Sequence, residues 1–247
     1  MKQKVVCTVE ARMTSSRLPG KVLLPAAGKP LLSHLIERLK LIPSVDEIVL
    51  ATTINAQDNP LAELAASMGI KCFRGSENDV MGRVIGAAES AQADIVVEIT
   101  ADCPLIDSDV AEQVIRLYQR NQCDYASNAA VRSYPDGMDV QVFSLACLKK
   151  SAAMTNDQSD REHVTRHIRL NPEIFRQLHL IAGPLDYAPE LGLTLDEPKD
   201  YELIKKIFET LGDRAIRFTC RELIRLLNVD HPEWLEINKS VVRKELN

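Results

Sequence analysis

The stretch KVVCTVEARMTSSRLPGKVLLPAAGKPLLSHLIERLK, residues 4–40, contains an apolar run, a polar loop and an amphipathic segment, in that order. The apolar run at 4–11 predicts a buried strand. The segment 30–40 has the apolar spacing of a helix that packs on one side, and Pro30 favours the first turn of a helix. A strand, a loop and a helix together form the repeating unit of an α/β protein.

The same alternation continues as far as residue 121. Further strands are expected at 46–53, 70–75 and 94–101, and further helices at 60–69, 79–92 and 109–121. Strands and helices that alternate this regularly predict a Rossmann-like, mostly parallel sheet with helices on both faces.

The pattern changes after about residue 122. Turn-forming residues at 134–137 separate two short apolar runs. Helices are then expected at 145–154 and 160–170, further short strands at 175–182 and 191–195, and helices at 199–212 and beyond residue 217. We expect a single domain, 1–247, in which residues 125–190 form an antiparallel excursion from the α/β core.

Composition limits the class of protein. The chain has 247 residues, of which 45% are hydrophobic and 26% charged, with a formal net charge of -5. This composition is typical of a folded globular protein, and its acidic balance argues against a nucleic-acid partner. The sequence has neither a signal-peptide pattern nor an apolar run that could span a membrane. Its six cysteines are scattered and should be reduced, so we expect a cytoplasmic protein.

Candidate ligand-binding residues follow the predicted strands, because ligands of parallel α/β sheets bind at the carboxyl ends of the strands. The loop after the first strand is basic, whereas Asp102 follows the fourth strand and Asp196 follows a late apolar run. A basic loop that faces two acidic strand ends predicts a phosphate-rich ligand that carries a divalent metal. The polar residues at these ends are Arg12, Ser15, Ser16, Arg17, Gly20, Lys21, Thr52, Thr53, Asn55, Thr100, Asp102, Asp196, Glu197 and Asp200.

The common nucleotide-binding motifs are absent from the sequence. Neither G-x-G-x-x-G nor G-x-x-x-x-G-K-[ST] follows the first strand, which argues against a Rossmann dehydrogenase and a P-loop kinase. Arg12, Arg17 and Lys21 could instead bind phosphate oxygens directly. The alternative is that they form a solvated basic loop.

Three other patterns each allow two interpretations. Asp102 is either a Mg²⁺ ligand or a turn-forming residue. Asp107 and Asp109 match the D-x-D metal motif of glycosyltransferases, but the motif directly precedes a predicted helix, so N-capping by Asp107 or Ser108 is the favoured interpretation. His163 and His167, four apart on a predicted helix, suggest zinc, yet no third ligand is evident and a polar helix face is favoured.

Several longer stretches together resemble one family. They are ARMTSSRLPGKVL (11–23), GSENDVMGRVIGAA (75–88), ITADCPLID (99–107), DGMDVQVFS (136–144), DREHVT (160–165) and LTLDEPKDYELI (193–204). They are similar to the cytidylyltransferases that make CMP-activated sugars, which include CMP-Kdo and CMP-sialic acid synthetases, and most of all to the branch called spore coat polysaccharide biosynthesis protein F. The resemblance extends to about residue 210, and it implies the fold of the nucleotide-diphospho-sugar transferases.

The resemblance implies a reaction and a role for individual residues. An oxygen of a sugar or sugar-like acid would attack the α-phosphate of CTP, and pyrophosphate would leave with Mg²⁺. Arg12, Lys21 and Asp102 would be catalytic, Asp102 and Asp196 would bind the metal, and a homodimer would form through residues 125–190. The nucleotide would contact Ala11, Arg12, Ser15, Ser16, Arg17, Gly20, Lys21, Thr52, Thr53, Asp79 and Arg83, and the acceptor would contact Asp136, Asp139, Gln141 and His163.

The chain departs from the family pattern at one position. CMP-Kdo synthetases carry Gly-Asp-Glu-Pro where this chain has Ala-Asp-Cys-Pro, so Cys103 replaces an acidic residue. The acceptor, the nucleotide base and the number of metals therefore stay open. Two other functions also remain: a GT-A glycosyltransferase that takes a nucleotide-sugar and uses Asp107 and Asp109, and a nucleotide-sensing protein without turnover.

Overall fold

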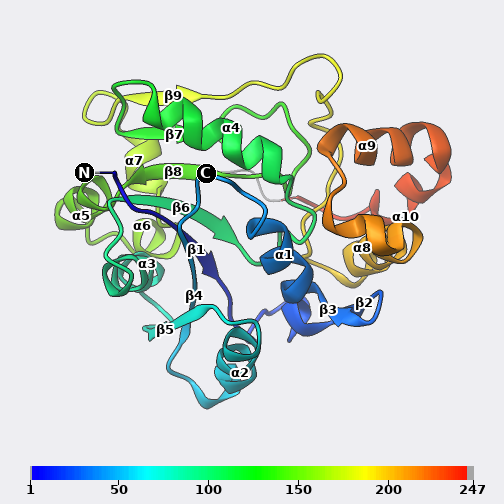
Figure 1. Ribbon diagram of the computed structural model, residues 1–247, viewed down its shortest axis with the longest axis horizontal. Helices are drawn as coiled ribbons and strands as arrows, with labels where there is room; N and C mark the ends of the chain where they lie inside the picture. The colour runs from blue at the N-terminus through cyan, green and yellow to red at the C-terminus, as the bar shows by residue number, and fades with distance from the viewer. Residues whose placement is uncertain (1, 244–247) are drawn as a thin grey trace.

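A seven-stranded sheet forms the centre of the computed structural model, which describes residues 2–243 (Figure 1). The strand order is β5-β4-β1-β6-β8-β7-β9, and β8 alone runs against the other six strands of this sheet. The predicted mostly parallel α/β sheet is therefore confirmed. The strands are β1 (Val5–Glu10), β4 (Glu47–Thr53), β5 (Lys71–Gly75), β6 (Ile95–Thr100), β7 (Tyr125–Ser127), β8 (Gln141–Ser144) and β9 (Gln177–His179), and β2 (Pro25–Ala26) pairs with β3 (Lys29–Pro30) in a small separate sheet.

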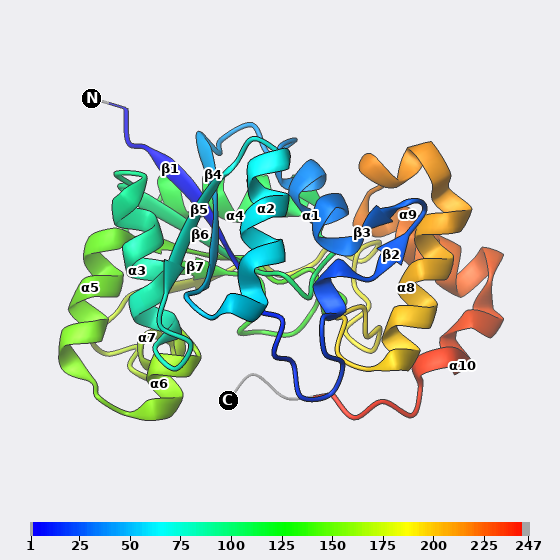
Figure 2. The same cartoon turned by 90° about the horizontal axis from the view of Figure 1, so that it is seen from below.

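Helices cover both faces of the sheet, as the alternation predicts. Side chains of α1, α2 and α4 pack in one hydrophobic cluster with one face, and those of α3, α5 and α7 pack in another with the opposite face. Figure 2 shows α8, α9 and α10 together at one end of the molecule, beside β2 and β3. The helices are α1 (Leu31–Leu39), α2 (Asn59–Ser67), α3 (Val80–Ser90), α4 (Ser108–Gln119), α5 (Leu145–Met154), α6 (Gln158–Glu162), α7 (Arg166–Leu170), α8 (Pro198–Leu211), α9 (Cys220–Arg225) and α10 (Leu235–Asn238).

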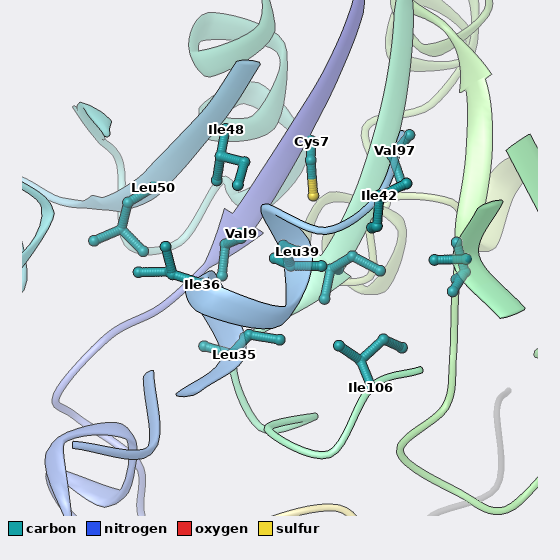
Figure 3. Close-up of a cluster of buried hydrophobic side chains, with 14 of the residues drawn as sticks. Cys7, Val9, Leu35, Ile36, Leu39, Ile42, Ile48, Leu50, Val97 and Ile106 are labelled. Carbon is teal, nitrogen blue, oxygen red and sulfur yellow. The ribbon is translucent and has the colours of Figure 1, made fainter. Parts of the chain in front are cut away.

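The β1 strand is buried on both faces because it lies inside a sheet that helices cover twice. Cys7 and Val9 point toward α1, and Val6 points to the cluster on the opposite face. Figure 3 shows Leu35 and Leu39 of α1 in the same cluster of side chains as Cys7 and Val9. Each buried side chain of this size stabilises the fold by about 1.5–3 kcal/mol. The apolar run at 4–11 and the helix spacing at 30–40 therefore encode one packed layer.

A buried arginine joins α1 to the C-terminal third of the described chain. Arg38 is 1% exposed and donates hydrogen bonds to the carbonyl oxygens of Ile106 at 2.6 Å, Ala215 at 2.9 Å and Phe218 at 2.8 Å. Its guanidinium lies 3.7 Å from the centre of the Phe218 ring. These contacts attach the segment after β6 and the segment before α9 to one helix.

Two expected elements differ from the structure. The helix predicted at 160–170 is broken, because α6 ends at Glu162 and His163 has φ −107° and ψ 51°. The break lets Thr165 donate a hydrogen bond to Gln141 at 2.5 Å. The strand predicted at 191–195 is reduced to a single bridge between Gly192 and Asp136. Of the predicted domain, residues 1 and 244–247 lie outside the described residues, and no helix between 2 and 243 is long and apolar enough to span a membrane.

We predict that Arg38→Met destabilises the protein by about 2–4 kcal/mol, because three buried carbonyl groups lose their donor while the side-chain volume is kept. Denaturant unfolding monitored by circular dichroism measures the loss. Arg120→Met, at an exposed position, is the matched control and should change stability little. A free energy of unfolding that is equal in the two variants would contradict the structural role of Arg38.

Candidate active site

The candidate site lies where β1 and β6 end side by side. These strands are parallel neighbours, and Glu10 at the end of β1 is opposite Thr100 at the end of β6. The chain continues from β1 to β4 on one side, whereas β6 lies on the other side, which makes this the switch point of the sheet. Ligands of open α/β sheets bind in the crevice at such a point.

Two acidic residues from other segments, Asp58 and Glu77, form hydrogen bonds with the basic loop after β1. The amide of Met13 donates to Asp58 at 2.7 Å, and Thr14 donates to Glu77 at 2.6 Å. Arg12 forms a longer contact of 3.4 Å with Glu77. Gly20 ends the loop with a φ of +70°, a conformation that a side chain disfavours. Asp58 and Glu77 were not among the predicted site residues, and no spacing in the sequence marks them.

Lys21 brings the two predicted metal-binding residues together. Its Nζ atom lies 3.2 Å from Asp102 Oδ2 and 3.1 Å from Asp196 Oδ1, and these residues are 81 and 175 positions away in the chain. Arg17 contacts the same Asp196 carboxylate at 2.8 Å and Glu197 at 3.6 Å. The structure therefore places two cations of the loop directly beside two acidic strand ends.

Charge pairing keeps this cluster ionised. Burial alone would raise the pKa of Asp102, but the neighbouring Lys21 ammonium outweighs it, and the pKa lies below the usual range. Burial would likewise lower the pKa of Lys21, and the two carboxylates raise it instead. Cys103 is different, because burial raises the pKa of its thiol well above the ordinary value. The site thus offers the carboxylates of Asp102 and Asp196. Cys103, which stands where CMP-Kdo synthetases have an acidic residue, stays a neutral thiol.

Asp200, also a candidate from the sequence, has a structural role. It is fully buried and accepts hydrogen bonds from the amides of Asp196 and Glu197 at the start of α8. Asn238 and Arg243 also donate to it, at 2.9 and 2.7 Å. Its carboxylate is committed to these four donors, so it positions Asp196.

Two cavities meet at the Lys21 cluster. The smaller, of about 290 Å³, contains seven of the predicted nucleotide-binding residues in its lining: Ala11, Arg12, Ser15, Ser16, Arg17, Lys21 and Arg83. The larger, of about 620 Å³, is lined by all four predicted acceptor-binding residues, Asp136, Asp139, Gln141 and His163, together with Asp102 and Asp196. Glu10, Arg17, Thr100, Asp102, Glu162 and His163 line both cavities.

Other predicted nucleotide-binding residues lie away from the cavity linings. Thr52 and Thr53 are fully buried, and Thr53 donates a short hydrogen bond to Asp58. Asp79 caps α3 by accepting a hydrogen bond from the amide of Gly82 at 2.8 Å, and it also pairs with Arg161. In this structure Thr53 and Asp79 therefore make structural contacts outside both cavity linings, and Gly20, which also lies outside them, ends the loop.

The alternative metal motifs are engaged in structural contacts. Asp107 accepts hydrogen bonds from the amides of Asp109 and Val110, which confirms it as the N-cap of α4, and from the amide of Cys220. His163 and His167 do not share a helix face because the helix is broken between them, and His167 lies 3.2 Å from Ser151.

A buried turn shapes the far end of the larger cavity. Arg132 donates to Asp136 at 3.0 Å and to Asp139 at 3.2 Å. Gly137 lies between Asp136 and Asp139 in the chain and has a φ of +101°. A Cβ atom at Gly137 would lie 2.8 Å from the backbone of Leu193. Only glycine therefore fits this turn. Burial raises the pKa of Asp139 to about 7, although Arg132 opposes this shift.

The sequence analysis missed several residues of the larger cavity, which are Glu10, Glu98, Arg132, Glu162, Thr165 and Arg169. Glu98 carried a signal: a charged residue in the middle of the apolar strand IVVEIT is costly unless it has a specific partner. The others belong to segments whose packing no local pattern describes.

The fold and the site together define a nucleotide-binding transferase of the α/β class. A CMP-2-keto-3-deoxy-manno-octonic acid synthetase solved with CTP has the same fold, with a TM-score of 0.63 at 20% identity over 84% of this chain and 99% of that one. The chain belongs to the cytidylyltransferase family, whose model matches residues 6–227. The resemblance stated from the sequence is thereby confirmed.

Individual relatives cover nearly the whole chain. The spore coat polysaccharide biosynthesis protein SpsF of Bacillus subtilis is 31% identical over 91% of this chain and 94% of its own length. The mitochondrial 3-deoxy-manno-octulosonate cytidylyltransferase of Arabidopsis thaliana is 34% identical over 98% of this chain and 84% of its own length. The solved structure of a cytidylyltransferase from Leptospira borgpetersenii has a TM-score of 0.90 at 31% identity, over 98% of this chain and all of that one.

We predict that Asp139→Asn becomes more stable relative to the original protein as the pH rises from 4 to 8. The folded protein holds a proton on Asp139 up to a pKa of about 7, whereas the unfolded chain releases it near pH 4, so this carboxyl lowers stability as the pH rises between these values. The amide has no such proton to lose. Urea unfolding at several pH values measures the difference, which should grow by about 1 kcal/mol or more.

Asp213→Asn, at an exposed position, is the control for this experiment. Its stability difference from the original protein should be the same at both ends of the pH range. A flat difference for Asp139→Asn as well would show that Asp139 does not carry the proton.

Proposed function

We propose that this cytidylyltransferase transfers CMP from CTP to an oxygen of a sugar or sugar-like acid, with Mg²⁺ as its cofactor and pyrophosphate as the leaving group. The observation that carries the proposal is the cluster of Lys21, Asp102 and Asp196 between the two cavities. A nucleoside triphosphate fits the smaller, basic cavity, and an acceptor fits the larger one. The two substrates would meet at the cluster.

The residues of the loop after β1 support transfer at phosphorus. In our proposal Arg12, Arg17 and Lys21 hold the triphosphate, and the backbone amides of residues 15–18 add further donors. The acceptor oxygen forms a bond to the α-phosphorus while the bond to the pyrophosphate oxygen breaks. This reaction needs positioning and charge neutralisation more than covalent participation by the protein, and fixed cations provide both.

The acidic residues of the site fit magnesium. Asp102 and Asp196 each place an oxygen within 3.2 Å of the Lys21 ammonium, so they can also approach a common cation. Between residues 2 and 243 no group of three or more His, Cys, Asp or Glu side chains is arranged to hold a metal. Magnesium is usually bound by one or two carboxylates together with substrate phosphates. When bound, it would neutralise charge on the triphosphate and the leaving pyrophosphate.

The relatives support a role in the synthesis of surface polysaccharides. The name of one relative places it in spore coat polysaccharide biosynthesis, and another is named for an octulosonate, a sugar acid. The alternative GT-A glycosyltransferase loses support, because its metal motif would need Asp107, which caps α4. We further propose a cytoplasmic enzyme with the acceptor side at residues 125–190.

We also propose that the same segment forms the interface of a homodimer. Six of the ten exposed large hydrophobic side chains among the described residues lie between residues 125 and 190. They are Val131, Met154, Leu170, Ile181, Leu185 and Tyr187.

We predict that Lys21→Ala and Asp102→Asn each lower the rate of pyrophosphate release from CTP by about 10²–10³-fold, because each removes a charge that acts on the triphosphate. A coupled pyrophosphate assay with an acceptor panel measures the rate. Lys29→Ala is the matched control, since Lys29 lies in the same segment but pairs with Glu37 at 2.7 Å on the surface. Full turnover in both site variants would overturn the assignment, and tight CTP binding without any turnover would support a nucleotide sensor.

We predict that removing divalent cations with EDTA abolishes pyrophosphate release and that added Mg²⁺ restores it. Asp196→Asn should raise the Mg²⁺ concentration needed for half-maximal rate by at least about tenfold, because a ligand is lost. The control is Asp109→Asn, because Asp109 is an exposed residue of the alternative D-x-D motif. This variant should leave the required Mg²⁺ concentration unchanged. Turnover that persists in EDTA would contradict the proposed cofactor.

A further inference from the structure

Two glutamates converge at the junction of the two cavities. Glu10 ends β1 and Glu98 lies in β6, and the register of these strands puts Glu98 opposite Thr8, two residues before Glu10. Because side chains alternate along a strand, Glu10 and Glu98 point to the same face of the sheet. Glu10 lines both cavities, and Glu98 lines the larger one.

Burial disfavours a negative charge on either carboxyl group. Burial and the neighbouring Glu98 carboxylate raise the pKa of Glu10 well above its ordinary value, and burial raises the pKa of Glu98. Glu98 is only 4% exposed and accepts a hydrogen bond from the side-chain amide of Gln141. Tyr125 and Thr165 both donate to Gln141 Oε1, so the NH₂ group of Gln141 is directed at Glu98. These contacts fix the position of Glu98 in the lining of the larger cavity.

One oxygen of the pair is left without a partner. Glu10 Oε1 is buried and has no hydrogen-bond partner among the described residues. Buried polar atoms in native proteins are nearly always paired, so this atom calls for a donor from outside the chain. Glu10 lines both cavities, so a bound substrate can supply that donor.

The surrounding charge favours a cationic donor. Seven carboxyl groups and three guanidinium groups line the larger cavity, and no lysine does among the described residues. Arg132 is shared by Asp136 and Asp139, and Arg17 by Asp196 and Glu197. The charged groups nearest the pair are Arg83 on α3, Arg169 on α7 and Asp102 after β6.

We propose that Glu10 and Glu98 form a binding subsite for a protonated primary amine on the acceptor. This inference rests on the proposed function, since it assigns a chemical class to the acceptor of that reaction. An ammonium group would favour the ionised form of both carboxyl groups and donate one of its three hydrogen bonds to Glu10 Oε1. A neutral hydroxyl in the same place would supply one donor and no charge. The pair is thus a specificity determinant, and the phosphate chemistry stays with Lys21 and Asp102.

The test compares acceptors that differ only in an amine and a hydroxyl. Suitable pairs are 2-aminoethylphosphonate with 2-hydroxyethylphosphonate and glucosamine 6-phosphate with glucose 6-phosphate, extended to matched pairs of sugar acids. We expect the amine member of at least one pair to have a kcat/KM for pyrophosphate release at least about tenfold higher, as a charged hydrogen bond provides. Glu10→Gln and Glu98→Gln should reduce this ratio to about one, whereas Glu63→Gln, on the exposed surface of α2, should keep it.

Calorimetry with CTP separates this inference from the proposed function. CTP affinity should be equal in the original protein and in Glu98→Gln, because Glu98 lines only the larger cavity, and melting temperatures show that both variants are folded. If the enzyme binds CTP and uses the hydroxyl acceptors as well as the amine acceptors, the proposed function stands and the amine subsite is overturned. An amine preference that survives both substitutions, or CTP binding with no turnover of any amine member, overturns it too.

Discussion

The ion pairs of Lys21 with Asp102 and Asp196 are the interaction on which the site depends. They join three segments that are far apart in the chain and place them between two cavities. Lys21 lies between the two carboxylates; it favours the charged form of Asp102, and both carboxylates favour the charged form of Lys21. A cation that binds the carboxylates and a triphosphate that binds the lysine would engage the same charges.

The sheet topology makes that interaction possible. The parallel pairing of β1 and β6 brings the basic loop and Asp102 to one edge, and α8 brings Asp196 there through Asp200. The antiparallel β8 then extends the sheet and carries Gln141 into the floor of the larger cavity. The two halves of the site therefore come from two parts of one sheet: the parallel part surrounds the smaller cavity, and the strands after residue 125 build much of the larger one.

Local patterns predicted much of this arrangement. The strands and helices up to residue 121 follow from apolar periodicity, and Asp107 was correctly interpreted as a helix cap from its place before an apolar helix. The positions of Arg17, Lys21, Asp102 and Asp196 at strand ends were enough to group them. Patterns failed after residue 122, where Thr165 bonds to Gln141 across the fold and a predicted helix breaks to allow it.

The sequence by itself determined the α/β class and the family, because these depend on periodicity and on motifs that are contiguous in the chain. Only the tertiary structure decided which charges pair. Glu10 and Glu98 are 88 positions apart, and their contact arises from the register of two strands. The raised pKa of Glu10, and the acidic cavity beside it, result from burial and from long-range geometry, which no short stretch of sequence encodes.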